Sequence, residues 1–387
     1  MFDSATFNHA ARVLGEVAPD FPADAALRRY LGLARRLGPR EKRAISRAVF
    51  IYFRWLQWLD ARDSLQKQLE NAVTLHDRVV RDPKSVKAET LAVRAVPTWL
   101  RGEMDLSPGY LQQLQREPAL WLRARPGTGA QLARTLGDCV PTPHAPDALH
   151  YTGSQDLFVT PAFHQGAFEI QDLASQLVSL AAAPQPRETW WDACAGEGGK
   201  TLHLADLMAN KGLIWSTDRN PRRLETLKRR AARAKLFNFR TALWDGSARL
   251  PTKTKFDGVL VDAPCSGVGT WQRNPHARWT ATVDDVRELA VTQLALLRHV
   301  APSLKPGGKL IYSVCTLTRA ETSAIASAFS AEHAEFEPLP LLAVAGEPVS
   351  VASNPAGSQA SAPSSQLFLW PQELNANGMF IAAWRKK

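Results

Sequence analysis

The spacing of apolar residues changes character partway along the chain. Residues 1–85 place apolar side chains at helical intervals, as in segments 26–33 and 44–56, with few glycines and prolines between them. The pair Gly38-Pro39 interrupts this pattern, and Pro39 is suited to the first turn of a following helix. We therefore expect an all-α domain over residues 1–85.

From about residue 166 the pattern alternates between short apolar runs and amphipathic segments. Residues 170–178 have the periodicity of an amphipathic helix. Alternation of strands and helices favours a doubly wound, mostly parallel sheet with helices on both faces. The predicted strands are 190–194, 213–218, 241–245, 258–262 and 309–315, and the helices between them are 200–208, 221–235 and 284–300.

The remaining segments are less regular. Proline and glycine punctuate residues 86–165, which we interpret as a small mixed α/β connecting subdomain. Residues 350–365 are rich in Ser, Ala, Pro and Gly and predict a flexible loop. Apolar runs at 367–370 and 379–384 predict a β-pair at the edge of the sheet. A chain of 387 residues accommodates this division into 1–85, 86–165 and 166–387.

Composition excludes several classes of protein. Hydrophobic residues make up 45% and charged residues 22%, which is an ordinary globular balance. No apolar run reaches the roughly 18 residues needed to cross a bilayer, and the N-terminus lacks the features of a secretory signal. We therefore expect no membrane partner and a cytoplasmic location. The 4 cysteines fit neither a disulfide framework nor a zinc site, so no metal is expected; they are Cys139, Cys194, Cys265 and Cys315.

The net charge of +10 makes a polyanionic partner plausible, because cationic side chains release counterions from nucleic acid phosphates. Many of the cations lie in the predicted helical domain. They are compatible with RNA contact and equally with an ordinary solvated surface. The residues are Arg28, Arg29, Arg35, Arg36, Arg40, Lys42, Arg43, Arg47 and Arg54.

A glycine-rich loop over residues 192–201 follows one predicted strand and opens a helix. Its glycines allow close approach of a ligand to the backbone, and the helix N-terminus presents free N–H groups. Asp218 ends the next strand, where a carboxylate can accept ribose hydroxyls, and Asp245 ends the third, where it can meet an adenine edge. These features fit a nicotinamide dinucleotide as well as other adenosine cofactors. A tight turn without any ligand is the alternative.

Two cysteines mark the ends of predicted buried strands: Cys265 in the run Asp-Ala-Pro-Cys-Ser-Gly after strand 258–262, and Cys315 as the last residue of strand 309–315. Ligands of open α/β sheets bind outside the carboxyl ends of the strands. A dehydrogenase would need a hydride-handling acid such as His or Tyr here. Two thiols with Asp262 three positions before Cys265 instead suit methyl transfer to C5 of a pyrimidine, which needs a thiolate to add to C6, an acid at N3 and help with elimination. The alternative for each cysteine is a small buried hydrophobe, which we prefer for Cys194.

At these residues the chain resembles the Nol1/Nop2/Sun family of RNA cytosine-5 methyltransferases, over residue 155 to the C-terminus. Segments 192–201, 262–267 and 312–317 are similar to its cofactor, fourth and sixth motifs, and segments 168–177 and 378–382 also match. The resemblance implies a Rossmann-like domain with a seven-stranded sheet and S-adenosyl-L-methionine as cofactor. It assigns the nucleophile to Cys315 and product release to Cys265. The implied cofactor contacts are Cys194, Ala195, Gly196, Glu197, Gly198, Gly199, Lys200, Asp218, Asp245 and Asp262.

The helical N-terminus is similar to the NusB-type RNA-binding domain fused to the small-subunit rRNA branch of that family. We therefore expect a cytosine of 16S rRNA as the substrate. A tRNA methyltransferase, a DNA cytosine-5 methyltransferase and an RNA-binding ribosome-assembly factor without catalysis are the alternatives. The chain departs from the family at four residues that put the substrate pocket in doubt: Glu197, His276, Thr322 and Asn377.

Overall fold

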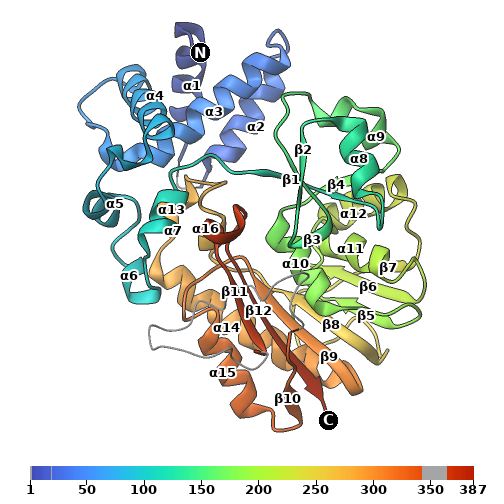
Figure 1. Cartoon of the computed structure of the whole chain (residues 1–387). Coiled ribbons are helices and arrows are strands. Elements are labelled where there is room, and N and C mark those ends of the chain that lie inside the picture. Colours follow the sequence, from blue (N-terminus) through green and yellow to red (C-terminus); the bar gives the residue numbers. More distant parts are fainter. Residues whose placement is uncertain (1, 19, 342–363) are drawn as a thin grey trace. The chain divides into compact units, whose positions relative to one another are not determined.

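The computed structural model describes residues 2–18, 20–341 and 364–387 (Figure 1). The chain forms two compact units, and each combines two stretches of sequence. We call Met1–Pro118 with Gly267–Val283 the helical unit, and Ala119–Ser266 with Asp284–Lys387 the sheet unit.

The helical unit confirms the predicted helices of the first 85 residues. Pro39 is the first residue of α3, as expected from its fixed φ angle. Asp3 and Ser64 cap α1 and α4 by accepting a hydrogen bond from a backbone N–H in the first turn. The main helices are α1 (Ser4–Leu14), α2 (Ala23–Leu33), α3 (Pro39–Trp55) and α4 (Leu65–Arg81), followed by α5 (Ala88–Arg94), α6 (Leu100–Glu103) and α7 (Pro108–Gln113).

The segment Gly267–Val283, which carries α13 (Ala277–Thr280), packs within the helical unit. The Arg278 guanidinium donates to the backbone carbonyls of Ala95 and Leu114, and the Trp279 indole donates to that of Phe53. The expected domain boundaries at residues 85 and 165 therefore do not coincide with the units of the structure. This packing depends on contacts between residues more than 160 positions apart, which local sequence patterns do not encode.

The sheet unit is built on an eight-stranded sheet in which β10-β12-β9-β8-β5-β6-β7 lie in a row and β11 pairs with β12. The expected sheet of seven strands is therefore exceeded by one, because β11 joins β12 outside this row. The pairings from β9 to β7 are parallel, and β12 is antiparallel to β9. The predicted pairing of the last two strands is confirmed. The strands are β5 (Thr189–Asp192), β6 (Leu213–Asp218), β7 (Phe239–Leu243), β8 (Phe256–Asp262), β9 (Leu304–Val314), β10 (Phe336–Pro338), β11 (Gln366–Leu369) and β12 (Met379–Lys386).

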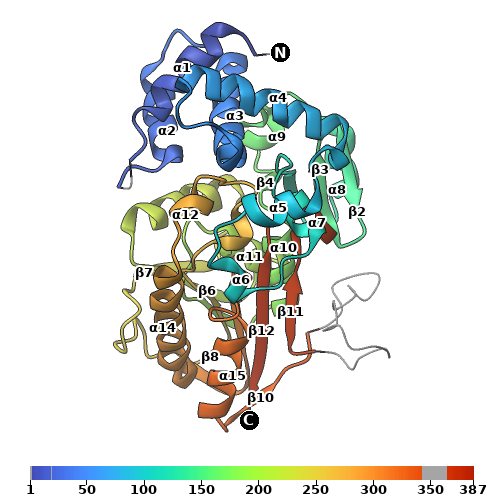
Figure 2. The same cartoon turned by 90° about the vertical axis from the view of Figure 1, so that its left-hand side faces the viewer.

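Helices cover both faces of this sheet (Figures 1 and 2). Successive residues of β8 point to opposite faces, so Leu260 joins one apolar cluster while Val259 and Val261 join the other. A parallel sheet buried on both sides needs such continuous apolar strands. The first cluster contains residues of α10 (Leu173–Ala182), α11 (Gly199–Leu207) and α12 (Pro221–Arg233), and the second contains residues of α14 (Val283–Val300) and α15 (Ser323–Glu332).

A second, four-stranded antiparallel sheet precedes the large one in sequence, with the order β2-β3-β1-β4. Residues 168–170 form its edge strand, so the helix expected over 170–178 begins later than predicted, at Leu173 after the N-cap Asp172. Pairing of β4 with β1 overrides the local helical periodicity, and it carries this sheet across the expected boundary at residue 165. The strands are β1 (Leu120–Ala124), β2 (Cys139–Thr142), β3 (Ala145–Tyr151) and β4 (Phe168–Ile170), with α8 (Gly129–Leu136) and α9 (Pro161–His164) between them.

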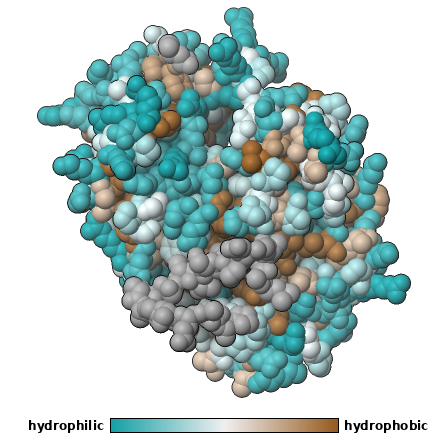
Figure 3. Space-filling model, viewed as in Figure 1, coloured by the Kyte–Doolittle hydropathy of each residue, from teal (hydrophilic) through white to brown (hydrophobic). Residues whose placement is uncertain are grey.

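The predicted flexible loop at 350–365 lies almost wholly outside the described residues. On the face shown in Figure 3 the surface is mostly hydrophilic, with hydrophobic residues in small groups. Within residues 2–18, 20–341 and 364–387, no helix combines the length and apolar character of a bilayer span.

Candidate active site

A cavity of 670 Å³ lies at the carboxyl ends of the parallel strands of the sheet unit. This is the expected ligand position in an open α/β sheet, because neighbouring loops diverge there. Gly198 is the one predicted site residue that is not part of its wall. The predicted residues that line it are Cys194, Ala195, Gly196, Glu197, Gly199, Lys200, Asp218, Asp245, Asp262, Cys265 and Cys315.

The glycine loop owes its shape to the two residues with positive φ. Gly196 has φ +54° and Gly198 has φ +86°, a region that only glycine adopts without strain. A Cβ on Gly198 would also lie 2.5 Å from Leu227 Cγ, whereas the space beside Gly196 is open. The loop is anchored from outside by Arg230, which donates to the carbonyl of Glu197 and to the carboxylate of Glu169.

Asp218 occupies the end of β6, as predicted, and faces the glycine loop. Its two carboxylate oxygens accept the N–H groups of Gly196 at 3.0 Å and Asn220 at 2.8 Å. A carboxylate has about four acceptor positions, so two remain for a ligand. Asp245 lies two residues beyond β7 and is exposed. The hydrogen bond to its side chain from Ser247 lowers the pKa of Asp245.

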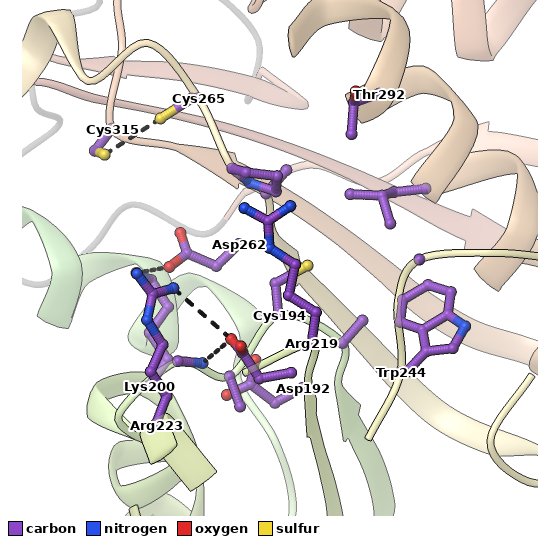
Figure 4. Close-up of a pocket in the computed structure, with 18 of the residues that line it drawn as sticks. Asp192, Cys194, Lys200, Arg219, Arg223, Trp244, Asp262, Cys265, Thr292 and Cys315 are labelled. Carbon is purple, nitrogen blue, oxygen red and sulfur yellow. Dashed lines mark hydrogen bonds and ion pairs between the residues drawn. The ribbon is translucent and has the colours of Figure 1, made fainter. Parts of the chain in front are cut away.

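The sequence did not point to the apolar part of the wall. The Trp244 ring packs against Trp191 at 4.9 Å between centroids, and its edge faces the cavity. In the sequence, nothing except the size of its side chain indicates that Trp244 contacts a ligand. Figure 4 shows the Trp244 ring across the cavity from Lys200 and Asp262. The other lining residues that sequence analysis left unassigned include Ser175, Arg219, Arg223, Val291, Thr292 and Leu296.

The structure brings Cys265 and Cys315 together. Their sulfur atoms are 3.3 Å apart, and both side chains are half-buried in the wall of the cavity (Figure 4). The two residues are 50 positions apart in sequence. Cys315 directly follows β9, and Cys265 lies three residues after β8, the parallel neighbour of β9. Both thiols can therefore reach the same bound group.

Asp262 links the helix that follows the glycine loop to β9, the strand that precedes Cys315. Its carboxylate accepts from Lys200 Nζ at 2.7 Å and from Ser313 Oγ at 2.8 Å. Burial by itself lowers the pKa of Lys200, but the Asp262 carboxylate more than offsets this effect and the pKa is raised above its ordinary value. The Cys315 thiolate acts in the same direction. Lys200 therefore stays cationic, and a cation near a thiol favours the reactive thiolate.

Burial shifts the pKa of two further lining residues, Asp192 and Cys194. Asp192, at the end of β5, is fully buried, and desolvation raises its pKa to about 7 although Thr201 donates a hydrogen bond to it. Burial, reinforced by the charges of Asp192 and Asp262, raises the pKa of Cys194 far above that of an ordinary thiol. A raised pKa favours the protonated thiol of Cys194 and so disfavours it as a nucleophile.

The four departures from the family pattern are spread through the chain. Glu197 is exposed, with its side chain at the cavity. His276 lies in the helical unit, where its ring packs on Phe53 at 4.6 Å. Thr322 is buried before α15 and donates to the carbonyl of Thr318. The N–H of Asn377 donates to the carboxylate of Asp172, the N-cap of α10. Of these four, Glu197 alone lines the cavity.

Among the described residues, no group of three or more His, Cys, Asp or Glu side chains has the arrangement of a metal site. The cavity instead combines backbone N–H groups, carboxylates, one buried ammonium and two thiols. Such a set can bind an adenosine cofactor and present a nucleophile to a second substrate.

Comparison with protein families gives a match over residues 179–385 to the family described as 16S rRNA methyltransferase RsmB/F. The chain is 34% identical over 300 residues to a probable ribosomal RNA small subunit methyltransferase B of Synechocystis sp., covering 75% of the chain and 64% of that protein. It is 37% identical over 231 residues to the protein of the same description from Bacillus subtilis, covering 59% of the chain and 50% of the relative. The chain thus spans between half and two thirds of these relatives.

Solved structures share the fold. The crystal structure of PH0851 superposes with a TM-score of 0.77 at 23% identity over 100% of both chains. A methyltransferase homolog protein from Pyrococcus horikoshii gives 0.61 at 27% identity, over 81% of the chain and 99% of the other. NSun6 from the same organism, crystallised with SFG, gives 0.60 at 20% identity over 72% and 93%. The Rossmann-like architecture expected from the sequence is confirmed.

Proposed function

The chain belongs to the 16S rRNA methyltransferase RsmB/F family, and from that premise we propose that it transfers a methyl group from S-adenosyl-L-methionine to C5 of a cytosine in 16S rRNA. The observation that carries the proposal is the 3.3 Å separation of the Cys265 and Cys315 sulfurs in a cavity shared with the glycine loop and Asp218. The reaction takes place in the cytoplasm, and the helical unit contributes to RNA binding through its basic helices.

The residues of the cavity suit S-adenosyl-L-methionine. Its 670 Å³ lies within the usual range for cofactor sites. Asp218 keeps acceptor positions for the ribose hydroxyls, and Trp244 offers an apolar surface to the adenine, with Asp245 at its edge. Backbone beside Gly196 is open to a close approach. When bound, the cofactor supplies an electrophilic methyl group. One structural neighbour, NSun6, was crystallised with SFG, an analogue of this cofactor.

Cys315 is the nucleophile in this proposal. Its thiolate forms a bond to C6 of the cytosine. The electron pair of the C5–C6 double bond shifts to the C4–C5 bond, and the pair of the C4–N3 double bond shifts to N3, which takes up a proton from the Lys200–Asp262 pair. C5 is then nucleophilic enough to accept the methyl group. Lys200 favours the thiolate at the start because a nearby cation stabilises it.

Release requires loss of the C5 proton and cleavage of the S–C6 bond. Cys265 assists here, because its sulfur lies beside that of Cys315 and faces the same base. A Cys265 thiolate takes the C5 proton, the C5–C6 double bond re-forms as the S–C6 bond breaks, the bonding pair returns to Cys315 as a thiolate, and N3 gives its proton back to the Lys200–Asp262 pair. Cys315 and the Lys200–Asp262 pair are thereby restored, and Cys265 returns to its starting state by passing the C5 proton to water.

The test is methyl transfer by the purified full chain. Reduced protein is incubated with methyl-labelled S-adenosyl-L-methionine and either 16S rRNA or total tRNA, and products are mapped by bisulfite sequencing. We expect 5-methylcytosine in 16S rRNA alone. A mark in tRNA with unmodified rRNA would assign the chain to tRNA, and RNA binding without any mark would favour the assembly factor.

A further inference from the structure

Glu321 is a fully buried carboxylate in the segment between β9 and α15. Burying an acid without a compensating partner costs several kcal/mol, so buried carboxylates are normally paired with a cation. Glu321 has no ion pair with any of the described residues. Hydrogen bonds from uncharged groups satisfy it instead.

These hydrogen bonds come from the residues that directly follow the two thiols. Ser266, next to Cys265, donates its N–H to Glu321 Oε1 at 2.8 Å and its hydroxyl to Oε2. Thr316, next to Cys315, donates its hydroxyl to Oε2 at 3.2 Å. The same carboxylate thus holds the loop of each cysteine.

A second layer of contacts fixes the same two loops. Gln293, fully buried on α14, donates to Glu321 Oε1 and to the carbonyl of Pro264, both at 2.9 Å. The Tyr312 hydroxyl, on β9, lies 2.7 Å from the carbonyl of Glu321 and 2.9 Å from Gln293 Oε1. Thr318 also donates to Glu321 Oε2, at 2.8 Å.

We propose that Glu321 is a positioning residue that holds the loop of Cys265 and the loop of Cys315 together, so that both thiols face one substrate base. Hydroxyl groups can rotate, but the N–H of Ser266 and the Gln293 amide need an acceptor at a fixed place. Removing the carboxylate leaves these donors buried without a partner, and the loops then move apart to reach water. The role in the reaction rests on the function proposed above, whereas the spacing of the thiols does not.

The spacing can be measured with phenylarsine oxide, which condenses with two neighbouring thiols to give a cyclic dithioarsenite and one water. We expect the reduced full chain to bind one equivalent with loss of two free thiols. Cys265→Ala and Cys315→Ala should each abolish this bidentate binding. Glu321→Ala should weaken it about tenfold or more, the effect expected when a buried hydrogen-bonding group loses its partner.

Glu321→Gln is the conservative variant, because its carbonyl can accept from Ser266 and Gln293 while its amide donates to the hydroxyls. It should restore arsenical affinity to within about threefold of wild type, well inside the effect of Glu321→Ala. Glu332→Gln, at an exposed glutamate of α15 paired with Arg298, is the matched control and should leave arsenical affinity at the wild-type value. Ser266→Ala removes a single hydroxyl from the network, so it decides the question if Glu321→Ala does not fold. It should weaken arsenical binding severalfold.

A purely structural role would lower the melting temperature of Glu321→Ala, or of Ser266→Ala, while leaving arsenical affinity in the folded protein unchanged. That result would overturn the proposal. The binding assay needs neither RNA nor cofactor, so its outcome is independent of methyl transfer. If arsenical affinity follows the prediction but no RNA is methylated, the function fails and the positioning role stands. If RNA is methylated but Glu321→Ala binds the arsenical as tightly as wild type, the proposed function stands and the positioning role of Glu321 fails.

Discussion

The ammonium group of Lys200 lies 2.7 Å from the carboxylate of Asp262, and this ion pair links α11 to the end of β8. The side chain of Lys200 is almost completely buried, while that of Asp262 is 30% exposed. Lys200 was expected to contact the cofactor and Asp262 to serve the reaction as well. In the proposed reaction, this pairing lets them act together on the proton at N3 of the base.

Lys200→Met and Asp262→Asn should each lower kcat for methyl transfer by about 100-fold or more, which is the usual effect of losing an acid–base group. Because both substitutions remove the same interaction, the double variant should be little worse than the worse single variant. Steady-state kinetics of the four proteins give this cycle. Lys211→Met, at an exposed lysine after the same helix, is the control. Independent, multiplicative losses would contradict a shared role.

The two cysteine variants should differ in kind. Cys315→Ala should abolish methyl transfer and form no covalent complex, because the thiolate assigned to attack C6 is then missing. Cys265→Ala should accumulate an RNA–protein adduct that survives denaturing electrophoresis, since addition proceeds and release does not. Gels with labelled RNA and cofactor show the difference. Cys139→Ala, at a cysteine of the small sheet, is the control. Adduct formation by Cys315→Ala would reverse the assignment.

Gly198→Ala tests the shape of the cofactor loop. A Cβ at φ +86° that lies 2.5 Å from Leu227 Cγ should reduce the free energy of unfolding by about 1–3 kcal/mol and weaken cofactor binding. Gly199→Ala is the matched control for stability alone, because no protein atom lies within 4 Å of its Cβ position but the residue lines the cavity. Urea unfolding and calorimetric titration with S-adenosyl-L-methionine measure both effects. Equal effects of the two substitutions on the free energy of unfolding would show that the loop is not strained at Gly198.

The stability of the protein should depend on the ionisation of Asp192. Burial raises its pKa from 3.8 to about 7, so between these values the folded protein holds a proton that the unfolded chain has released. Folding stability from this group is fully present below pH 3.8 and is lost as the pH rises towards 7. Asp192→Asn cannot lose a proton there. As the pH rises from 3.8 to about 7, the free energy of unfolding of Asp192→Asn should therefore increase relative to that of wild type by up to ~4 kcal/mol.

Urea unfolding of wild type and Asp192→Asn at several pH values checks this prediction. Asp284→Asn, at an exposed aspartate of α14, should follow the wild-type curve. Parallel curves for wild type and Asp192→Asn would show that Asp192 is ionised in the folded protein.

Local patterns predicted the parts of the site that depend on short stretches of chain. The glycine loop, Asp218 and the two cysteines were predicted at strand ends, and the structure has them there. They could be predicted because apolar runs and glycines in the sequence directly indicate those strands and turns. The helix expected over residues 170–178 begins only at Leu173, because Ile170 belongs to β4, whose pairing with β1 depends on a strand more than 40 positions away. Glu321 was missed for a related reason. Its partners, including Ser266 and Gln293, come from distant segments.

The sequence by itself determined which chemical groups stand at the carboxyl ends of the strands, since apolar periodicity sets the strands and the sheet is parallel. Only the tertiary structure decided how these groups combine. The parallel pairing of β8 with β9 brings the two sulfurs to 3.3 Å, and the packing of α11 on the sheet directs Lys200 to Asp262. Packing also placed residues 267–283 in the helical unit. Such contacts join residues far apart in sequence, and their distances follow from close packing of whole elements, which no local pattern records.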